Sequence, residues 1–126
     1  MFLNKILFLA GIYNLIWGAI NILFPHLIFD LLGLDHPLYP EFWQCIGMIV
    51  GVYGLGYLIA SRDYILHWPI VLVGGLGKVL GPIGFVQSLI KGVFPLEFGW
   101  VILFNDLIWW IPCFLMLKES YKHHQR

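Results

Sequence analysis

The chain has 126 residues and a formal net charge of zero; 60% of its residues are hydrophobic and only 11% are charged. Ordinary soluble domains carry roughly 25% charged residues, so a soluble fold of this composition would leave too much apolar surface in water. The length fits one domain, and the balanced charge gives no reason to expect a nucleic-acid partner. We therefore expect a single integral membrane domain over residues 1–126.

Four segments have the roughly 20 mostly apolar residues that a membrane-spanning helix requires. They cover approximately residues 4–24, 41–60, 69–90 and 99–117. The predicted fold is all-α: a four-transmembrane-helix up-down bundle with a short interfacial helix, at about 25–32, after the first span.

The first span is expected to be retained and not cleaved as a signal peptide. Its apolar run is long, contains Asn14 and Asn21, and lacks an A-x-A cleavage site. Pro25 ends this span, because proline cannot continue the hydrogen-bond ladder, and it suits the first position of a new helix. The short segment that follows stops at Gly33 and is expected to lie in the headgroup plane.

The basic residues outside the spans predict the orientation. Lys5, Arg62 and three basic residues of the tail 118–126 lie at the N-terminus, in the second loop and at the C-terminus, whereas the first and third loops contain only Lys91. Because basic segments stay in the cytoplasm, both termini are expected there. The polar tail is expected to be solvated.

Glycines at helical spacing predict closely packed helices, since small residues let two backbones approach each other. These helix-packing glycines are Gly11, Gly18, Gly47, Gly51, Gly54, Gly74 and Gly81. Packing within one chain is one interpretation of the second-span glycines, and a homodimer face is the other. Pro82, after Gly81, is expected to kink the third helix.

Polar residues of three spans lie at one depth. Lys78, Asp106 and Asn14 are each near the middle of a span. At 1.5 Å per residue, they lie roughly 14–17 Å from the inner boundary, at the midplane of a ~30 Å hydrocarbon core. Stripes of small residues on the same helix faces indicate that these side chains point into the bundle.

Two unpaired charges at this depth would cost ~5–7 kcal/mol. This cost predicts a Lys78–Asp106 ion pair, with Asn14 or Asn105 filling the remaining hydrogen bonds. Two interpretations stay open: a ligand or proton site, or a structural clasp that fixes the helix register.

Several aromatic residues are candidates for the lining of a cavity at this level, or for ordinary packing. They are Tyr53 and Tyr57, one turn apart on the second span, and Trp109, with Trp17 and Trp110 as further members of an aromatic wall.

No catalytic residue, metal site or cofactor is expected. The metal-capable residues of the outer side, such as His26 and Asp30, have no recognised ligand spacing, and no nucleotide-binding motif or nucleophile elbow occurs. Haem would require a histidine near the midplane, and none of the five histidines lies there. Cys45 and Cys113 lie within spans, near opposite faces, so neither a disulfide nor an accessible reactive thiol is expected. A protein that is not an enzyme is therefore favoured.

Sequence features in all four spans carry a family resemblance. They are NLIWGAINILFP followed by LIFDLLGL, then GMIVGVYGLGY, GKVLGPIGF and NDLIWWIP. With these features the chain resembles the small four-helix bacterial membrane proteins of the DoxX-like kind. The resemblance implies a multi-pass protein of the bacterial inner (plasma) membrane, of a kind mostly without an assigned function and sometimes associated with redox or oxidative-stress partners. It carries over no functional residues.

The expected function is binding of a small or lipid-like ligand, or proton relay, at the midplane layer of Lys78, Asp106, Asn14 and Asn105. The alternative is an accessory or structural subunit of a larger membrane complex. The expected partners are membrane lipid and either a second copy of the chain or a larger complex.

Overall fold

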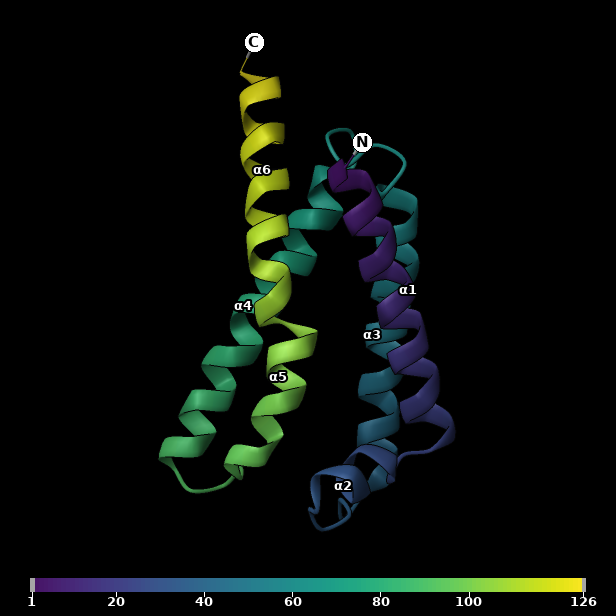
Figure 1. Ribbon diagram of the computed structural model, residues 1–126, viewed down its shortest axis with the longest axis vertical. Helices are drawn as coiled ribbons and strands as arrows, with labels where there is room; N and C mark the ends of the chain where they lie inside the picture. Colours follow the sequence, from purple (N-terminus) through teal and green to yellow (C-terminus); the bar gives the residue numbers. More distant parts are fainter. Residues whose placement is uncertain (1, 126) are drawn as a thin grey trace.

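The computed structural model describes residues 2–125, and this range contains helices and loops but no strand (Figure 1). The helices are α1 (Phe2–Leu23), α2 (Leu27–Leu32), α3 (Pro40–Ala60), α4 (Trp68–Ile90), α5 (Gly99–Asn105) and α6 (Trp110–His124), with short 3₁₀ turns at Leu96–Phe98 and Leu107–Trp109. Four helical stretches are long and apolar enough to cross a membrane: α1, α3, α4 and Leu96–His124. The predicted all-α class is confirmed, and four helical stretches that are long and apolar enough to span a membrane coincide with the four predicted segments.

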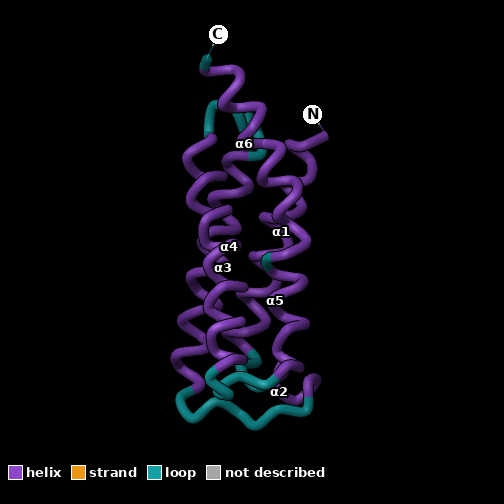
Figure 2. The backbone as a smooth tube through the Cα atoms, turned by 90° about the vertical axis from the view of Figure 1, so that its left-hand side faces the viewer, coloured by secondary structure: helices purple, strands orange, loops and turns teal. Residues whose placement is uncertain are grey.

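The two ends of the chain lie at the same end of the bundle, and α2 lies at the opposite end (Figure 1). The α3–α4 loop is found beside the termini, and the α4–α5 loop lies at the level of α2. Figure 2 shows an elongated bundle whose loops gather at its ends, with one short loop segment about halfway along. The halfway segment marks an interruption inside the last helical stretch.

The starts and stops of the helices follow local backbone chemistry. Pro40 and Pro69 lie in the first turns of α3 and α4, where a missing N–H costs nothing. Gly33 ends α2 with φ of 70°, a left-handed conformation that glycine adopts without strain. The short second helix was expected from residue 25, but Pro25 and His26 form a turn and the helix begins at Leu27.

Helices α1 and α3 pack most closely, through glycines. A Cβ atom added at Gly11 would lie 2.9 Å from the carbonyl oxygen of Gly54, and one at Gly18 would overlap the carbonyl oxygen of Gly47. Only glycine allows this approach. The glycine face of α3 is thus occupied by α1, as expected if these glycines serve packing within one chain.

The hydrophobic core lies toward the end that carries the termini. Its buried members are Leu7, Ala10, Tyr57, Ala60, Tyr64, Val71 and Met116, which come from α1, α3, the α3–α4 loop, α4 and α6. Large apolar side chains elsewhere face outward, for example Leu9, Val52, Leu80 and Phe114, one from each long helical stretch. In a bilayer, such outward apolar side chains contact the lipid acyl chains.

The tail is mostly exposed, but it is helical. Helix α6 continues through it to His124, and Ser120 within it is buried, with its hydroxyl donating to the carbonyl of Met116 at 2.8 Å. The last helix is therefore longer than the predicted span that ended at 117.

Candidate functional site: a polar cavity at an interrupted helix

The fourth span is interrupted at the depth of the predicted polar layer. Helix α5 ends at Asn105, Asp106 leaves the helical conformation (φ −121°, ψ −59°), and α6 begins at Trp110 after a 3₁₀ turn. The predicted fourth segment at 99–117 is present, but it is not one regular helix, and the interruption was not predicted. Pro112 supplies the reason: its ring clashes with the carbonyl of Ile108, four residues earlier, and it has no N–H to donate.

The interruption leaves main-chain carbonyls at the end of α5 without helical donors. Two side chains fill these positions. The indole Nε1 of Trp109 donates to the carbonyl of Phe104 at 3.0 Å, and Nζ of Lys78 donates to the carbonyl of Asn105 at 2.7 Å. Since the C-terminal end of a helix carries partial negative charge, the carboxyl end of α5 is a fitting partner for the lysine.

Lys78 lies deep in the bundle, with 7% of its surface exposed. Its Nζ is 5.6 Å from the ring centroid of Tyr57 and 5.9 Å from that of Trp109. Aromatic faces attract a cation at these distances. The carbonyl, the helix end and the two rings together stabilise the ammonium form of the side chain.

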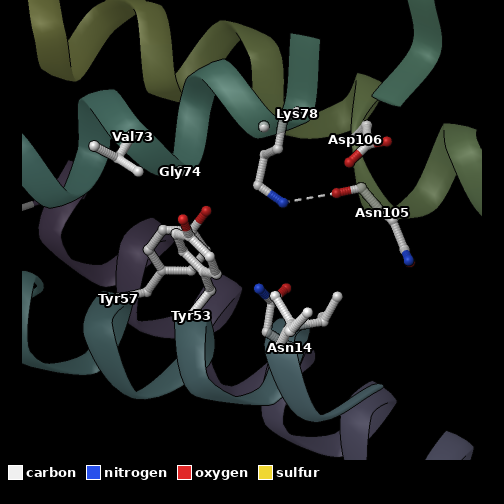
Figure 3. A pocket seen from close by; sticks show the side chains of 11 residues that line it. Asn14, Tyr53, Tyr57, Val73, Gly74, Lys78, Asn105 and Asp106 are labelled. Atoms are coloured by element: carbon white, nitrogen blue, oxygen red, sulfur yellow. Dashed lines mark hydrogen bonds between the residues drawn. The ribbon is translucent and has the colours of Figure 1, made fainter. Parts of the chain in front are cut away.

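The expected Lys78–Asp106 ion pair is absent. Within residues 2–125, the one carboxylate within 4.0 Å of a basic nitrogen belongs to Asp30, at 2.6 Å from Nε2 of His36. The Asp106 carboxylate lies instead against Gly81 of α4, where a Cβ atom would overlap Oδ2. The turn of the backbone at Asp106 directs the carboxylate toward that glycine, while Lys78 reaches the main chain beside it (Figure 3).

Helix α4 is continuous across Pro82, the predicted kink position. Pro82 deprives the carbonyl of Lys78 of its helical donor. The indole Nε1 of Trp110 donates to this carbonyl at 2.9 Å. Residue 78 is thus held twice, by its side chain to the end of α5 and by its carbonyl to the start of α6.

A cavity of about 220 Å³ lies next to Lys78. Its lining comes from α1, α3, α4 and α5 and comprises Asn14, Ile49, Val50, Tyr53, Tyr57, Val73, Gly74, Gly77, Lys78, Asn105 and Asp106. Figure 3 shows the two tyrosines, Asn14 and Lys78 converging on this space. The structure therefore brings together the four residues of the predicted polar layer and the two predicted lining tyrosines.

Several polar groups face the cavity without a protein partner. Asn14 is 5% exposed and Tyr57 is 3% exposed, yet within residues 2–125 no hydrogen bond joins the Asn14 amide or the Tyr57 hydroxyl to another group. The Tyr57 hydroxyl lies against Gly74, which has no side chain to displace it. Lys78 uses one of its three N–H donors. Within residues 2–125, the one fully enclosed side-chain nitrogen or oxygen without a hydrogen-bond partner is His26 Nδ1, outside this cavity. The polar atoms of Asn14 and Tyr57 are therefore open to the cavity and available to a molecule that enters it.

Two contacts at the site were not predicted. The Tyr13 hydroxyl donates to the side-chain oxygen of Asn105, which fixes this residue from α1. Trp109 was predicted to line the cavity, but it lies outside the lining and instead contacts Lys78. In the sequence, only the position of Tyr13 next to Asn14 pointed to this contact, because Tyr13 lies off the glycine stripe of the same helix.

A second polar group of residues lies at the α2 end. The rings of His26 and His36 stack with centroids 4.0 Å apart, and Asp30 pairs with His36. Across the described part of the chain, no three His, Cys, Asp or Glu side chains come close enough together to hold a metal ion. Cys45 and Cys113 are both free.

No protein-family model, curated protein or solved structure matches the chain. The function must therefore be inferred from the cavity.

Proposed function

We propose that this multi-pass membrane protein binds a small or lipid-like ligand in the cavity beside Lys78. The observation that carries the proposal is the set of polar groups that face the cavity without a protein partner, above all Asn14, the Tyr57 hydroxyl and the two remaining N–H donors of Lys78. A hydrogen bond typically contributes about 0.5–1.5 kcal/mol net, so a ligand that pairs with several of these groups gains affinity from each.

The size of the cavity limits the ligand. Clefts for drug-sized molecules enclose roughly 300–1,000 Å³, and this cavity encloses about 220 Å³. A small molecule, or the head of a larger amphiphile, fits this space.

We place the protein in the bacterial inner membrane, as an up-down bundle with α2 in the headgroup plane and both termini in the cytoplasm. The resemblance to DoxX-like proteins supports the membrane assignment, and the basic residues at the terminus-bearing end support the orientation. Two variants test this orientation: His36→Cys and His123→Cys, each made in a protein that lacks Cys45 and Cys113 and each labelled in intact cells. Residue 36 should react with an impermeant reagent, and residue 123 should react only after lysis.

A matched pair of glycine substitutions tests ligand binding. Gly77 lines the cavity and Gly84 lies two turns further along α4, and a Cβ atom at either position meets no other atom within 4 Å. Gly77→Leu should fill the cavity, and Gly84→Leu should leave it open. Native mass spectrometry of protein extracted from membranes should detect a small-molecule adduct on wild type and Gly84→Leu that Gly77→Leu lacks. An adduct of equal occupancy on all three proteins, or on none, would count against the proposal.

The alternative is an accessory subunit whose polar centre is structural. The interlock of Lys78 with Asn105, and of Trp110 with the carbonyl of Lys78, favours it, because these bonds hold α4, α5 and α6 together without any ligand. Under this alternative the protein elutes with a larger membrane complex after gentle extraction, and Gly77→Leu leaves that complex intact.

A further inference from the structure

The polar groups of the cavity are not balanced between donors and acceptors. Lys78 Nζ has two unused N–H donors, and the hydroxyls of Tyr53 and Tyr57 add further donors from across the space (Figure 3). Asn14, on α1, lies on the same side as the tyrosines and can both donate and accept. The group that fits between them is an oxygen acceptor.

The acidic residue of the site does not cancel this preference. The Asp106 carboxylate lies against Gly81 on the α4 side, and Figure 3 shows it beyond Asn105, on the far side from the tyrosines and Asn14. Lys78, by contrast, extends toward the tyrosines. Asp106 and Lys78 both line the cavity, but the ammonium is the charge on the side of the tyrosines and Asn14. One negative charge on the ligand matches it there, whereas a dianion would add a second charge near Asp106.

The cavity reaches the lipid face of the bundle between α3 and α4. Three of its lining residues are exposed to the surroundings: Ile49 by 54% and Tyr53 by 38% on α3, and Val73 by 50% on α4. Leu76 and Val52 beside them are also exposed, by 54% and 64%. In a bilayer these side chains meet acyl chains, so the natural entrance is from the lipid.

We infer that the ligand is a single-chain amphiphile with a monoanionic carboxylate head. The head enters between α3 and α4 and is held by Lys78 Nζ and the Tyr57 hydroxyl, while the alkyl chain stays among Ile49, Val73 and the surrounding lipid. This inference rests on the proposed function, because it names the ligand class of the same cavity.

Chain-matched probes test the head group. The full chain in a neutral maltoside detergent is titrated with decanoate, decanol or decyltrimethylammonium below their micelle-forming concentrations, and with propionate as a water-soluble carboxylate. We expect decanoate to give a saturable rise in Tm and a bound adduct by native mass spectrometry. Decyltrimethylammonium should give neither, and decanol and propionate should bind at least tenfold more weakly.

Three variants connect the selectivity to the named groups. Tyr57→Phe removes one hydroxyl and keeps the ring, so decanoate binding should weaken by up to about tenfold, the loss of one hydrogen bond. Lys78→Met should abolish the preference for decanoate over decanol. Lys91→Met, the same substitution at the exposed end of α4, should bind decanoate as wild type does.

The outcomes separate the inference from the proposed function. Equal binding of all three decyl amphiphiles, or unchanged decanoate binding by both Lys78→Met and Tyr57→Phe, overturns the carboxylate inference. If such binding is nevertheless lost in Gly77→Leu and kept in Gly84→Leu, the cavity remains a ligand site of another class. If Gly77→Leu binds like wild type, the cavity is not the site and both proposals fall. Should Lys78→Met not fold, Tyr57→Phe and the probe series still decide the matter.

Discussion

The indole N–H of Trp110 donates to the carbonyl of Lys78 at 2.9 Å, and this is the carbonyl that Pro82 leaves without a helical donor. A proline on one helix and a tryptophan on another thus form a complementary pair. The pair allows α4 to run through Pro82 as a continuous helix, which keeps Lys78 at the level of Asn105.

Trp110→Phe tests this relationship. It removes the donor and leaves the Lys78 carbonyl unpaired, so the free energy of unfolding should fall by about 1–2 kcal/mol. Adding Pro82→Ala should restore much of the loss, because residue 82 then donates to the same carbonyl. Thermal unfolding in mild detergent measures both effects. Trp100→Phe, at an exposed position, is the control, and absence of rescue by Pro82→Ala would contradict the assignment.

Pro112→Ala tests the origin of the interruption in the fourth span. The carbonyl of Ile108 then gains a helical donor and loses a clash, so residues 106–109 should move toward regular α-helix. Cα chemical shifts of these residues in detergent micelles report the change. Pro95→Ala, in the extended residue before the Leu96–Phe98 turn, should leave those shifts as they are. Shifts that stay non-helical in Pro112→Ala would assign the interruption to Asn105 and Asp106 instead.

Gly18→Ala and Gly51→Ala should have opposite effects although both residues lie at the α1–α3 contact. A Cβ atom at Gly18 overlaps the carbonyl of Gly47, whereas one at Gly51 meets nothing within 4 Å. Gly18→Ala should therefore lower the free energy of unfolding by about 1–3 kcal/mol. Gly51→Ala should leave it equal or raise it by up to about 1 kcal/mol through helix propensity. Equal losses in the two variants, measured by thermal unfolding, would contradict the packing described.

Tyr64, in the α3–α4 loop, should make stability sensitive to alkaline pH. Burial, and then the Glu119 carboxylate that accepts a 3.4 Å bond from the phenol, raise the pKa of Tyr64 above its ordinary value of 10.0. A group whose pKa is raised by folding contributes stability that is complete below its unfolded pKa and is lost as the pH rises through its folded pKa. The Tm should thus fall above pH 10, and Tyr64→Phe should fall less steeply. Tyr121→Phe, at an exposed position, should follow wild type.

The sequence predicted the all-α class and the polar residues that meet at the cavity, but not their hydrogen bonds. Hydropathy located all four spans, and small-residue stripes indicated which faces of α1 and α3 meet. Lys78 and Asp106 were paired on charge alone, because a continuous fourth helix has no free carbonyl to offer. The carbonyl that Lys78 binds is free only because Pro112 interrupts that helix. Pro82 was expected to disturb the third span, but no such effect was predicted for Pro112 in the fourth.

The cavity itself could not be predicted from residue patterns. Its volume depends on how far α3 stands from α4, and glycine stripes do not specify that distance. Tyr13 shows the same limit: its bond to Asn105 depends on the rotation of α1 relative to α5, which hydrophobic periodicity leaves open by tens of degrees.

The bond between Lys78 and Asn105 joins residues 27 positions apart, so the lysine is synthesised before its acceptor. At about 5–20 residues per second, the ribosome needs roughly one to five seconds to add the missing stretch. During that interval α4 carries an unpartnered ammonium, whose insertion at a helix centre costs about 2.5–3.5 kcal/mol. That cost offsets part of the favourable insertion of the apolar residues of α4, so α4 should be anchored more firmly once the fourth span supplies the carbonyl of Asn105. A chain that ends before the fourth span should be extracted from the membrane at alkaline pH more readily than the full chain.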